Sequence, residues 1–158
     1  MCAIVDASVV SQVFGTKRTE AGEEFFRWID SNTNGRLVVG GKLSEELEKV
    51  SEFHRWAREA ALSGKMRVIN KDQVDRTEED LRMSLVCSSN DAHVIALAQV
   101  SGARLLYSND NKLQRDFNNK DLISNPRGKV YTTNKGRTAF SPDHRKLLAR
   151  RDLCRAKA

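Results

Sequence analysis

The sequence predicts a single α/β domain with three layers, in which a central, mostly parallel sheet is covered by helices on both faces. Short apolar runs of strand-forming residues alternate along the chain with longer segments of helical periodicity. The runs are short and mainly apolar, as expected for strands that are buried on both faces. The length of 158 residues, with 39% hydrophobic residues, is sufficient for one domain with its own core.

The predicted elements follow one another in a regular order. The predicted strands are residues 2–6, 36–39, 67–69, 103–107 and 129–132. The predicted helices are residues 21–30, 42–62, 77–86, 91–101 and 111–117. Gly102 lies between a helix and a strand, where a helix-ending glycine is expected. We expect residues 1–133 to form the domain and residues 134–158 to form a basic C-terminal extension.

Charge and cysteine content narrow the class of protein. The formal net charge of +6 favours a polyanionic partner such as nucleic acid. The three cysteines lie far apart and lack C-x-x-C spacing, so the sequence indicates neither a disulfide framework nor a zinc site. No apolar run has the length of a membrane span, and Asp6 comes too early for a secretory signal. We therefore expect a cytoplasmic protein without a membrane partner.

Acidic residues stand where strands of the predicted sheet end. The first strand ends on Asp6, although buried strands avoid charge. Asp110 follows a later strand, and Asp91 opens the helix before that strand, on the same stripe as Val94 and Ile95. Binding sites of open parallel sheets form beyond the carboxyl ends of the strands. These three acids are therefore expected to face one site.

The helix predicted at residues 42–62 adds a fourth acid. Helical periodicity places Glu46 on the flank of the apolar stripe and Glu45 on the opposite face, with Lys49 as its i,i+4 partner. Glu46 is therefore preferred, and Glu45 is the alternative. Each acid taken alone also has an ordinary structural explanation, as a helix cap, a turn residue or a charge beside the core.

Four carboxylates at one edge of a sheet need protons or a cation to offset their repulsion. Two unit charges ~4 Å apart repel by about 1 kcal/mol in water and by about 4 kcal/mol at an effective dielectric constant of about 20. Hard oxygen ligands suit Mg²⁺ or Mn²⁺. The expected metal ligands and catalytic residues are the same four acids: Asp6, Glu46, Asp91 and Asp110. Both one and two bound ions remain open.

Four motifs in this order resemble the PIN-domain nucleases. They are IVDASVV (residues 4–10), LSEEL (43–47), NDAHVIALA (90–98) and LYSNDNKL (106–113). The resemblance implies a fold related to the Rossmann type and a metal-dependent endonuclease that usually acts on RNA. It also implies a homodimer and the toxin role of a toxin–antitoxin pair, both of which are frequent in that family.

The resemblance carries over to individual residues. It implies that the four acids hold the metal, that Ser8 lies beside the site, and that Asp116 is a peripheral acid. Toxin members usually place a Thr and an aliphatic residue before the Glu, whereas this chain has GGKLSEE at residues 40–46.

The sequence therefore predicts a divalent-metal-dependent endoribonuclease, with an antitoxin or another protein as its partner. The alternatives are a non-catalytic nucleic-acid-binding module and a protein-interaction module with the same fold. An enzyme with phosphoaspartate chemistry is disfavoured, because Asp6 is followed by Ala7 and Ser8 and not by a second nearby Asp. We expect His93 and His144 to have surface or packing roles.

The C-terminal extension is rich in positive charge. From Ser141 onward it holds six Lys and Arg residues against two Asp residues. Its cations are expected to hold nucleic-acid phosphates by charge without reading bases, and the alternative is a solubilising terminus. The expected contacts include Arg145, Lys146, Arg150 and Arg151.

Overall fold

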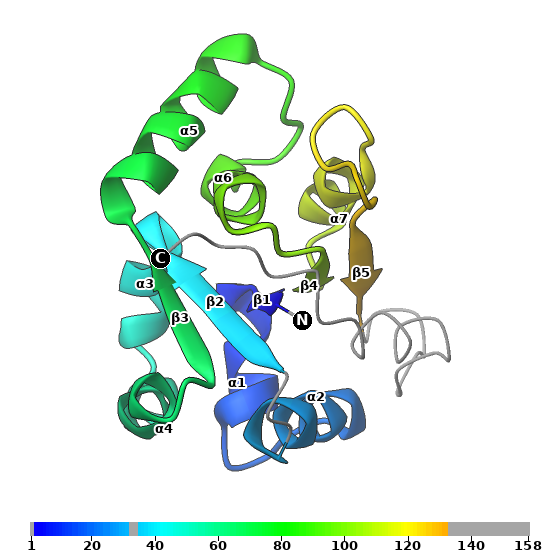
Figure 1. Ribbon diagram of the computed structural model, residues 1–158. Helices are drawn as coiled ribbons and strands as arrows, with labels where there is room; N and C mark the ends of the chain where they lie inside the picture. The colour runs from blue at the N-terminus through cyan, green and yellow to red at the C-terminus, as the bar shows by residue number, and fades with distance from the viewer. Residues whose placement is uncertain (1, 32–34, 133–158) are drawn as a thin grey trace.

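A computed structural model describes residues 2–31 and 35–132 of the chain (Figure 1). Five parallel strands form one sheet in the order β3-β2-β1-β4-β5. Their bounds are Cys2–Val5 (β1), Arg36–Gly40 (β2), Met66–Ile69 (β3), Leu105–Tyr107 (β4) and Lys129–Tyr131 (β5). The five predicted strands and the parallel sheet are confirmed.

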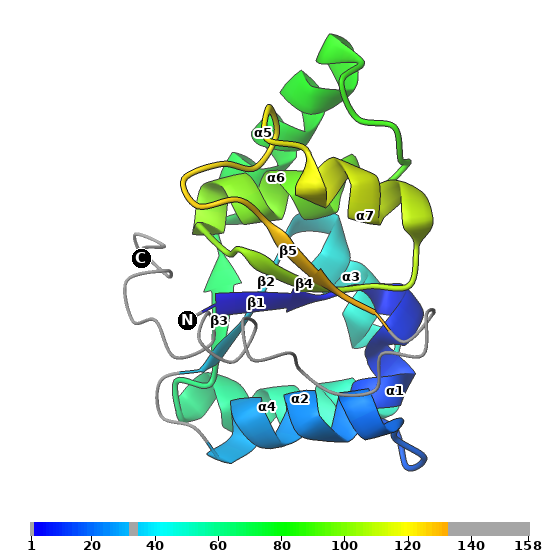
Figure 2. The ribbon, with the colours of Figure 1, turned by 90° about the vertical axis from the view of Figure 1, so that its right-hand side faces the viewer.

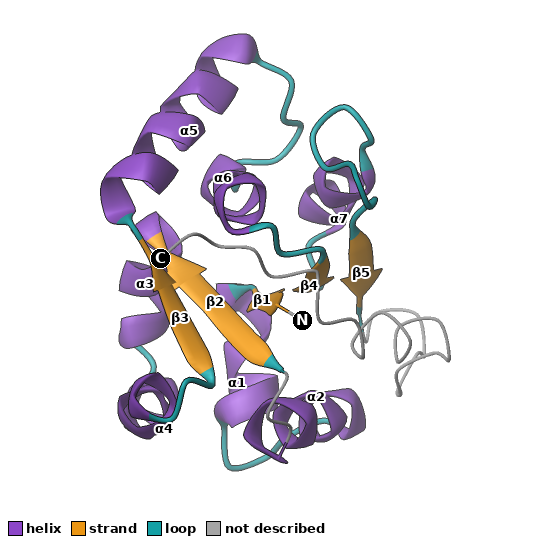
Figure 3. Ribbon diagram, in the orientation of Figure 1, coloured by secondary structure: helices purple, strands orange, loops and turns teal. Residues whose placement is uncertain are grey.

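Helices cover both faces of this sheet, which Figure 3 shows at the centre of the molecule. In Figure 2, one layer contains α5 (Lys71–Ser84), α6 (Ala92–Ser101) and α7 (Asn111–Asn118). The opposite layer contains α1 (Val10–Phe14), α2 (Glu20–Ser31) and α4 (Ser51–Leu62). A short 3-10 turn, η1 (Ala7–Val9), follows β1, and α3 (Gly41–Glu48) follows β2 directly. The predicted three-layer α/β/α class is thus confirmed.

The most buried helix is α6, which lies between α5 and α7 (Figure 1). Every residue from Ala92 to Ala98 is buried, as expected of a helix that is apolar on nearly all sides. The helix ends at Gly102, whose φ of 76° is in the left-handed region and whose N–H donates to the Ala98 carbonyl. This end was predicted correctly.

The helix predicted at residues 42–62 is in fact two helices. The chain leaves α3 at Lys49, and Val50 takes an extended conformation before α4 begins. The side chain of Val50 packs on the core, so the apolar periodicity continues across a change of direction. Periodicity alone therefore could not show the break.

Two other predictions about helices were incomplete. Helix α5 begins six residues earlier than residue 77, because the side chain of Asn70 caps it by accepting from the Gln73 N–H at 3.1 Å. The helical residues between β1 and Gly15 were not predicted, since their apolar run reads as a continuation of the strand.

Among the described cysteines, Cys2 is buried in β1 and Cys87 is a partly buried free thiol. As for membranes, none of the helices in the described part of the chain combines the length and apolar character that crossing a bilayer requires.

The position between β1 and β4 differs from the other positions between neighbouring strands of the sheet. From β1 the chain adds β2 and β3 on one side, and it then returns to add β4 and β5 on the other side. The carboxyl ends of β1 and β4 therefore lie next to each other at a topological switch point, where open parallel sheets form binding crevices.

Candidate active site

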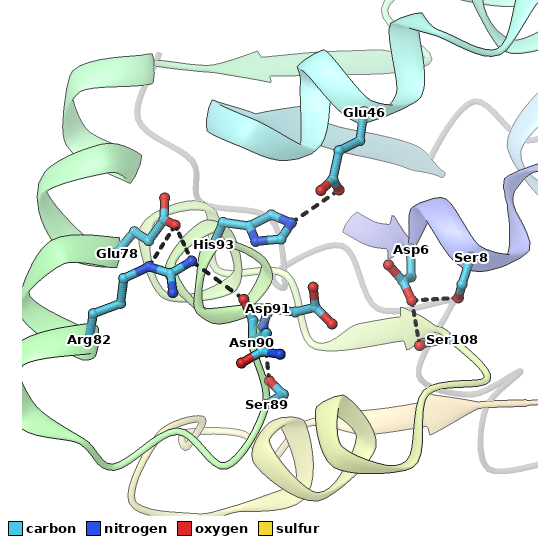
Figure 4. A network of polar contacts seen from close by, with 10 residues as sticks. All are labelled: Asp6, Ser8, Glu46, Glu78, Arg82, Ser89, Asn90, Asp91, His93 and Ser108. Carbon is cyan, nitrogen blue, oxygen red and sulfur yellow. Dashed lines mark hydrogen bonds and ion pairs between the residues drawn. The ribbon is translucent and has the colours of Figure 1, made fainter.

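Asp6 lies at this switch point and is held in place by two hydroxyl groups. The residue is only 5% exposed. Oδ2 accepts hydrogen bonds from Ser8 Oγ at 2.6 Å and from Ser108 Oγ at 2.7 Å (Figure 4). Among the described residues, nothing donates to Oδ1, so one oxygen of this buried carboxylate remains available to a ligand.

Ser108 joins Asp6 to Asp110. The Ser108 hydroxyl is buried and donates to Asp6 while it accepts from the Asp110 N–H at 3.1 Å. Asp110 itself caps α7, because its Oδ1 accepts from the Leu113 N–H at 2.9 Å. Ser108 was not among the predicted site residues, although its place between a strand and an acid is a usable signal.

Asp91 stands at the N-cap position of α6, but its side chain makes no capping hydrogen bond. In Figure 4 the carboxylate points toward Asp6. Burial raises the pKa of Asp91, and the negative charges of Asp6, Asp110 and Glu46 raise this pKa further, whereas His93 acts in the opposite direction. The three other predicted acids thus all lie close enough to Asp91 to act on its charge.

Glu46 points toward α6, and Glu45 does not. The Oε2 atom of Glu46 lies 3.2 Å from His93 Nε2 (Figure 4). Glu45 is exposed and forms an ion pair with Lys71 at 3.7 Å, so the expected pairing with Lys49 was wrong. Tertiary structure brings Lys71 to Glu45 from the first turn of α5.

His93 is the residue of this site that sequence reasoning undervalued. Its side chain is 1% exposed, and its Nδ1 atom is buried without a hydrogen-bond partner. It is buried, as a packing role would require, but it also contacts Glu46. The signal was a polar residue two positions after Asp91, within the otherwise apolar run from Ala92 to Ala98.

The four acids lie near one another, but they do not enclose a common position for a metal ion. No Lys or Arg of the described residues lies within ion-pair distance of Asp6, Asp91 or Asp110. Within residues 2–31 and 35–132, no group of three acidic, histidine or cysteine side chains is close enough to enclose a metal ion. The chemistry of the donor set still fits a divalent cation, since it consists of oxygen ligands whose repulsion a cation would offset.

Asp116, expected as a peripheral acid, is buried beneath the loop that leads into α6. It is 3% exposed and accepts hydrogen bonds from Ser88 and Ser89. The cationic residues predicted to bind phosphates, Arg145, Lys146, Arg150 and Arg151, lie outside the described residues, as does His144.

Comparison with models of known protein families shows to which family this chain belongs. The family model of the PIN domain matches residues 3–117, which include all four acids. The chain belongs to the PIN domain family. PIN domains are generally nucleases, which hydrolyse phosphodiester bonds, and they typically use divalent metals. A search among curated proteins found no match to this PIN domain.

Proposed function

We propose that this PIN domain is a divalent-metal-dependent endonuclease that cleaves RNA. The observation that carries the proposal is a set of four carboxylates at the carboxyl edge of the sheet, in which no described Lys or Arg pairs with Asp6, Asp91 or Asp110. Burial and the charges of the three other acids, which raise the pKa of Asp91, support it. A protein that only folded would gain nothing from such a set, and a buried charge without a partner costs stability.

Asp6, Glu46, Asp91 and Asp110 are the residues that would hold the metal. When bound, Mg²⁺ or Mn²⁺ lowers the pKa of a coordinated water and offsets charge on the phosphate under attack. The chain contributes a prepared set of ligands. Ser8 and Ser108 hold Asp6 through one oxygen, and Ser108 also fixes the backbone that leads to Asp110.

Helix α7 supports RNA as the substrate. Its outward face lines a cavity of about 530 Å³ that begins one residue after Asp110. Arg115 on this face forms no hydrogen bond or ion pair with any described residue. Guanidinium and amide groups donate to phosphate oxygens, sugar hydroxyls and base edges, which single-stranded RNA exposes. The cavity is lined by Asn111, Gln114, Arg115, Asn118 and Asn119.

A non-catalytic nucleic-acid-binding module is the alternative function. Binding alone does not favour acids beside a polyanion, because unpaired carboxylates repel phosphates. The acids at the switch point therefore support catalysis over binding alone. An antitoxin or other protein partner, a homodimer and the toxin role itself stay predictions.

The first test is cleavage of single-stranded RNA by the purified protein. We expect cleavage with Mn²⁺ and none after a chelator removes the ion. Asp6→Asn should lower activity about a hundredfold or more, because even residues outside the first ligand shell typically contribute 10–100-fold. Circular dichroism should show an unchanged fold.

Neighbouring glutamates provide a matched control. Glu46→Gln should lose activity, whereas Glu45→Gln should retain it, because only Glu46 points toward α6. Cleavage that persists with chelator would refute the metal mechanism, and equal losses in the two variants would refute the choice of Glu46.

A further inference from the structure

We propose that Asp116 is a positioning residue that sets the place of Asp91 through the hydroxyl group of Ser89. This inference deepens the proposed function and rests on it, since the place of Asp91 matters for catalysis if Asp91 binds a metal. It assigns a role to a buried acid that lies outside the four candidate ligands.

Both oxygens of the Asp116 carboxylate accept hydrogen bonds from the loop that precedes α6. Its Oδ1 accepts from the N–H and Oγ of Ser88 at 2.8 and 2.7 Å. Its Oδ2 accepts from the N–H and Oγ of Ser89 at 2.9 and 2.7 Å. Burial acts to raise the pKa of Asp116, but these four hydrogen bonds hold it below the ordinary value. Asp116 is therefore ionised at neutral pH and makes strong, charge-assisted bonds.

Ser89 links Asp116 to the backbone of Asp91. While its hydroxyl donates to Asp116, it also accepts a hydrogen bond from the Asp91 N–H at 3.3 Å (Figure 4). The side chain of Asp91 has no capping bond of its own to hold it. The direction of the Asp91 carboxylate therefore depends on how the backbone enters α6.

A second contact holds the same loop from the side of α5. Arg82 Nη2 donates to the Asn90 carbonyl at 3.4 Å, and Glu78 accepts from the same guanidinium at 3.0 and 2.8 Å (Figure 4). This contact is long and exposed, whereas the contacts to Asp116 are short and largely buried. Asp116 is the stronger anchor of the two.

Helix α7 thereby relates two of the candidate ligands to each other. Asp110 caps its first turn, and Asp116 lies in the same helix and reaches Asp91 through Ser89. One rigid helix can thus set the spacing between Asp110 and Asp91. Groups outside the ligand shell commonly orient the ligands in this way, and changing them typically costs 10–100-fold in metal affinity or activity.

Ser88 and Ser89 allow a matched experiment. Each hydroxyl donates to one oxygen of Asp116 at 2.7 Å, but only that of Ser89 also contacts Asp91. Ser88→Ala and Ser89→Ala should therefore lower the melting temperature by similar amounts. Titration calorimetry with Mn²⁺ should show affinity about tenfold weaker in Ser89→Ala and nearly unchanged in Ser88→Ala. Ser89→Thr, which keeps the hydroxyl, should restore the affinity.

A metal-free measurement separates this inference from the proposed function. Hydrogen exchange of the Asp91 amide should be faster in Ser89→Ala and unchanged in Ser88→Ala. Equal Mn²⁺ affinities in the two variants would overturn the positioning role. If the unaltered protein binds no Mn²⁺, the metal-dependent function fails, and amide exchange then decides the inference: unchanged exchange in Ser89→Ala overturns it, and faster exchange in that variant alone supports it.

Discussion

Asp6 and Asp116 are both buried carboxylates, yet their surroundings suit different tasks. Asp116 accepts four hydrogen bonds, two on each oxygen. All four come from the loop before α6, so its carboxylate oxygens are saturated. Asp6 accepts two, both on Oδ2. A saturated carboxylate stabilises structure, whereas a half-saturated one retains an oxygen for a ligand. The hydrogen bonds thus separate the structural acid from the candidate metal ligand.

Asp91 should destabilise the metal-free fold at neutral pH. Its raised pKa means that the folded state prefers the protonated form, so stability falls as pH rises from the ordinary value of 3.8 through the raised pKa. Asp91→Asn removes the charge, and its side chain forfeits no hydrogen bond seen in the described structure. We expect this variant to be more stable at pH 7, by up to about 1 kcal/mol or roughly 2–4 °C in melting temperature.

Two controls complete this measurement by thermal unfolding. The difference between Asp91→Asn and the unaltered protein should vanish in acid, below pH about 3.8, where Asp91 is neutral in both states. Mn²⁺ should raise the melting temperature of the unaltered protein and not that of the variant. A variant less stable than the unaltered protein at pH 7 would show that the carboxylate is structural.

At the scale of elements, α3 owes its place to a glycine. Gly41 has a φ of +54°, and a Cβ there would lie 2.8 Å from Val74 Cγ1 of α5. The absence of a side chain lets β2 turn into α3 without a loop and lets α3 approach α5 closely. Glu46 lies on α3. Gly40 and Gly41, which stand where toxin members differ in sequence, therefore contribute to the placement of Glu46.

Helix α7 has a buried face and an exposed face. Leu113, Asp116 and Phe117 are buried, whereas Asn111, Arg115 and Asn118 are exposed and line the cavity. The proposed RNA path therefore makes a prediction about Arg115. Arg115→Ala should weaken binding of single-stranded RNA and reduce the slope of log affinity against log salt by about 0.7, the value for one phosphate contact.

Arg76 on α5 provides the control for this variant. It is exposed and, like Arg115, forms no hydrogen bond or ion pair with described residues, but α6 separates its helix from α7 (Figure 1). Fluorescence anisotropy without divalent cations measures binding without cleavage. An equal change of slope in Arg76→Ala and Arg115→Ala would indicate general attraction by net charge and would remove α7 from the RNA path.

At the scale of the whole molecule, the sheet order gathers acids that are distant in sequence. Asp6 and Ser108 are 102 positions apart, and Glu46 and His93 are 47 apart. Because all strands are parallel, every carboxyl end lies at the same edge of the sheet. A net positive charge such as the +6 of this sequence attracts polyanions at long range.

The basic extension at residues 134–158 gives a prediction for the complete chain. Truncation after Thr133 should leave Mn²⁺ affinity unchanged, weaken RNA binding, and flatten the salt dependence by about 0.7 for each lost phosphate contact on a single strand. Calorimetry and anisotropy provide the two measurements. An unchanged slope would assign this charge to something other than RNA, and unfolding of the truncated chain would show that the extension belongs to the core.

Local patterns in the sequence were sufficient for the five strands, the end of α6 at Gly102 and the places of Asp6 and Asp110 just beyond two strands. Strand and helix periodicities and glycine preferences arise within a few residues, so they can be recognised without knowing what packs against them. Helical phase likewise indicated that Glu46 and not Glu45 faces the interior, and in the structure Glu46 contacts His93.

The tertiary structure decided the features that depend on contact between distant elements. The break at Val50 serves packing on the core, Glu45 pairs with Lys71 of another helix, and the link from Asp116 to Asp91 crosses from α7 to α6. Whether a polar group is neutralised, shared or left with a free lone pair depends on which partners the fold brings to it. Long-range pairing sets those partners, and no local pattern in the sequence encodes it.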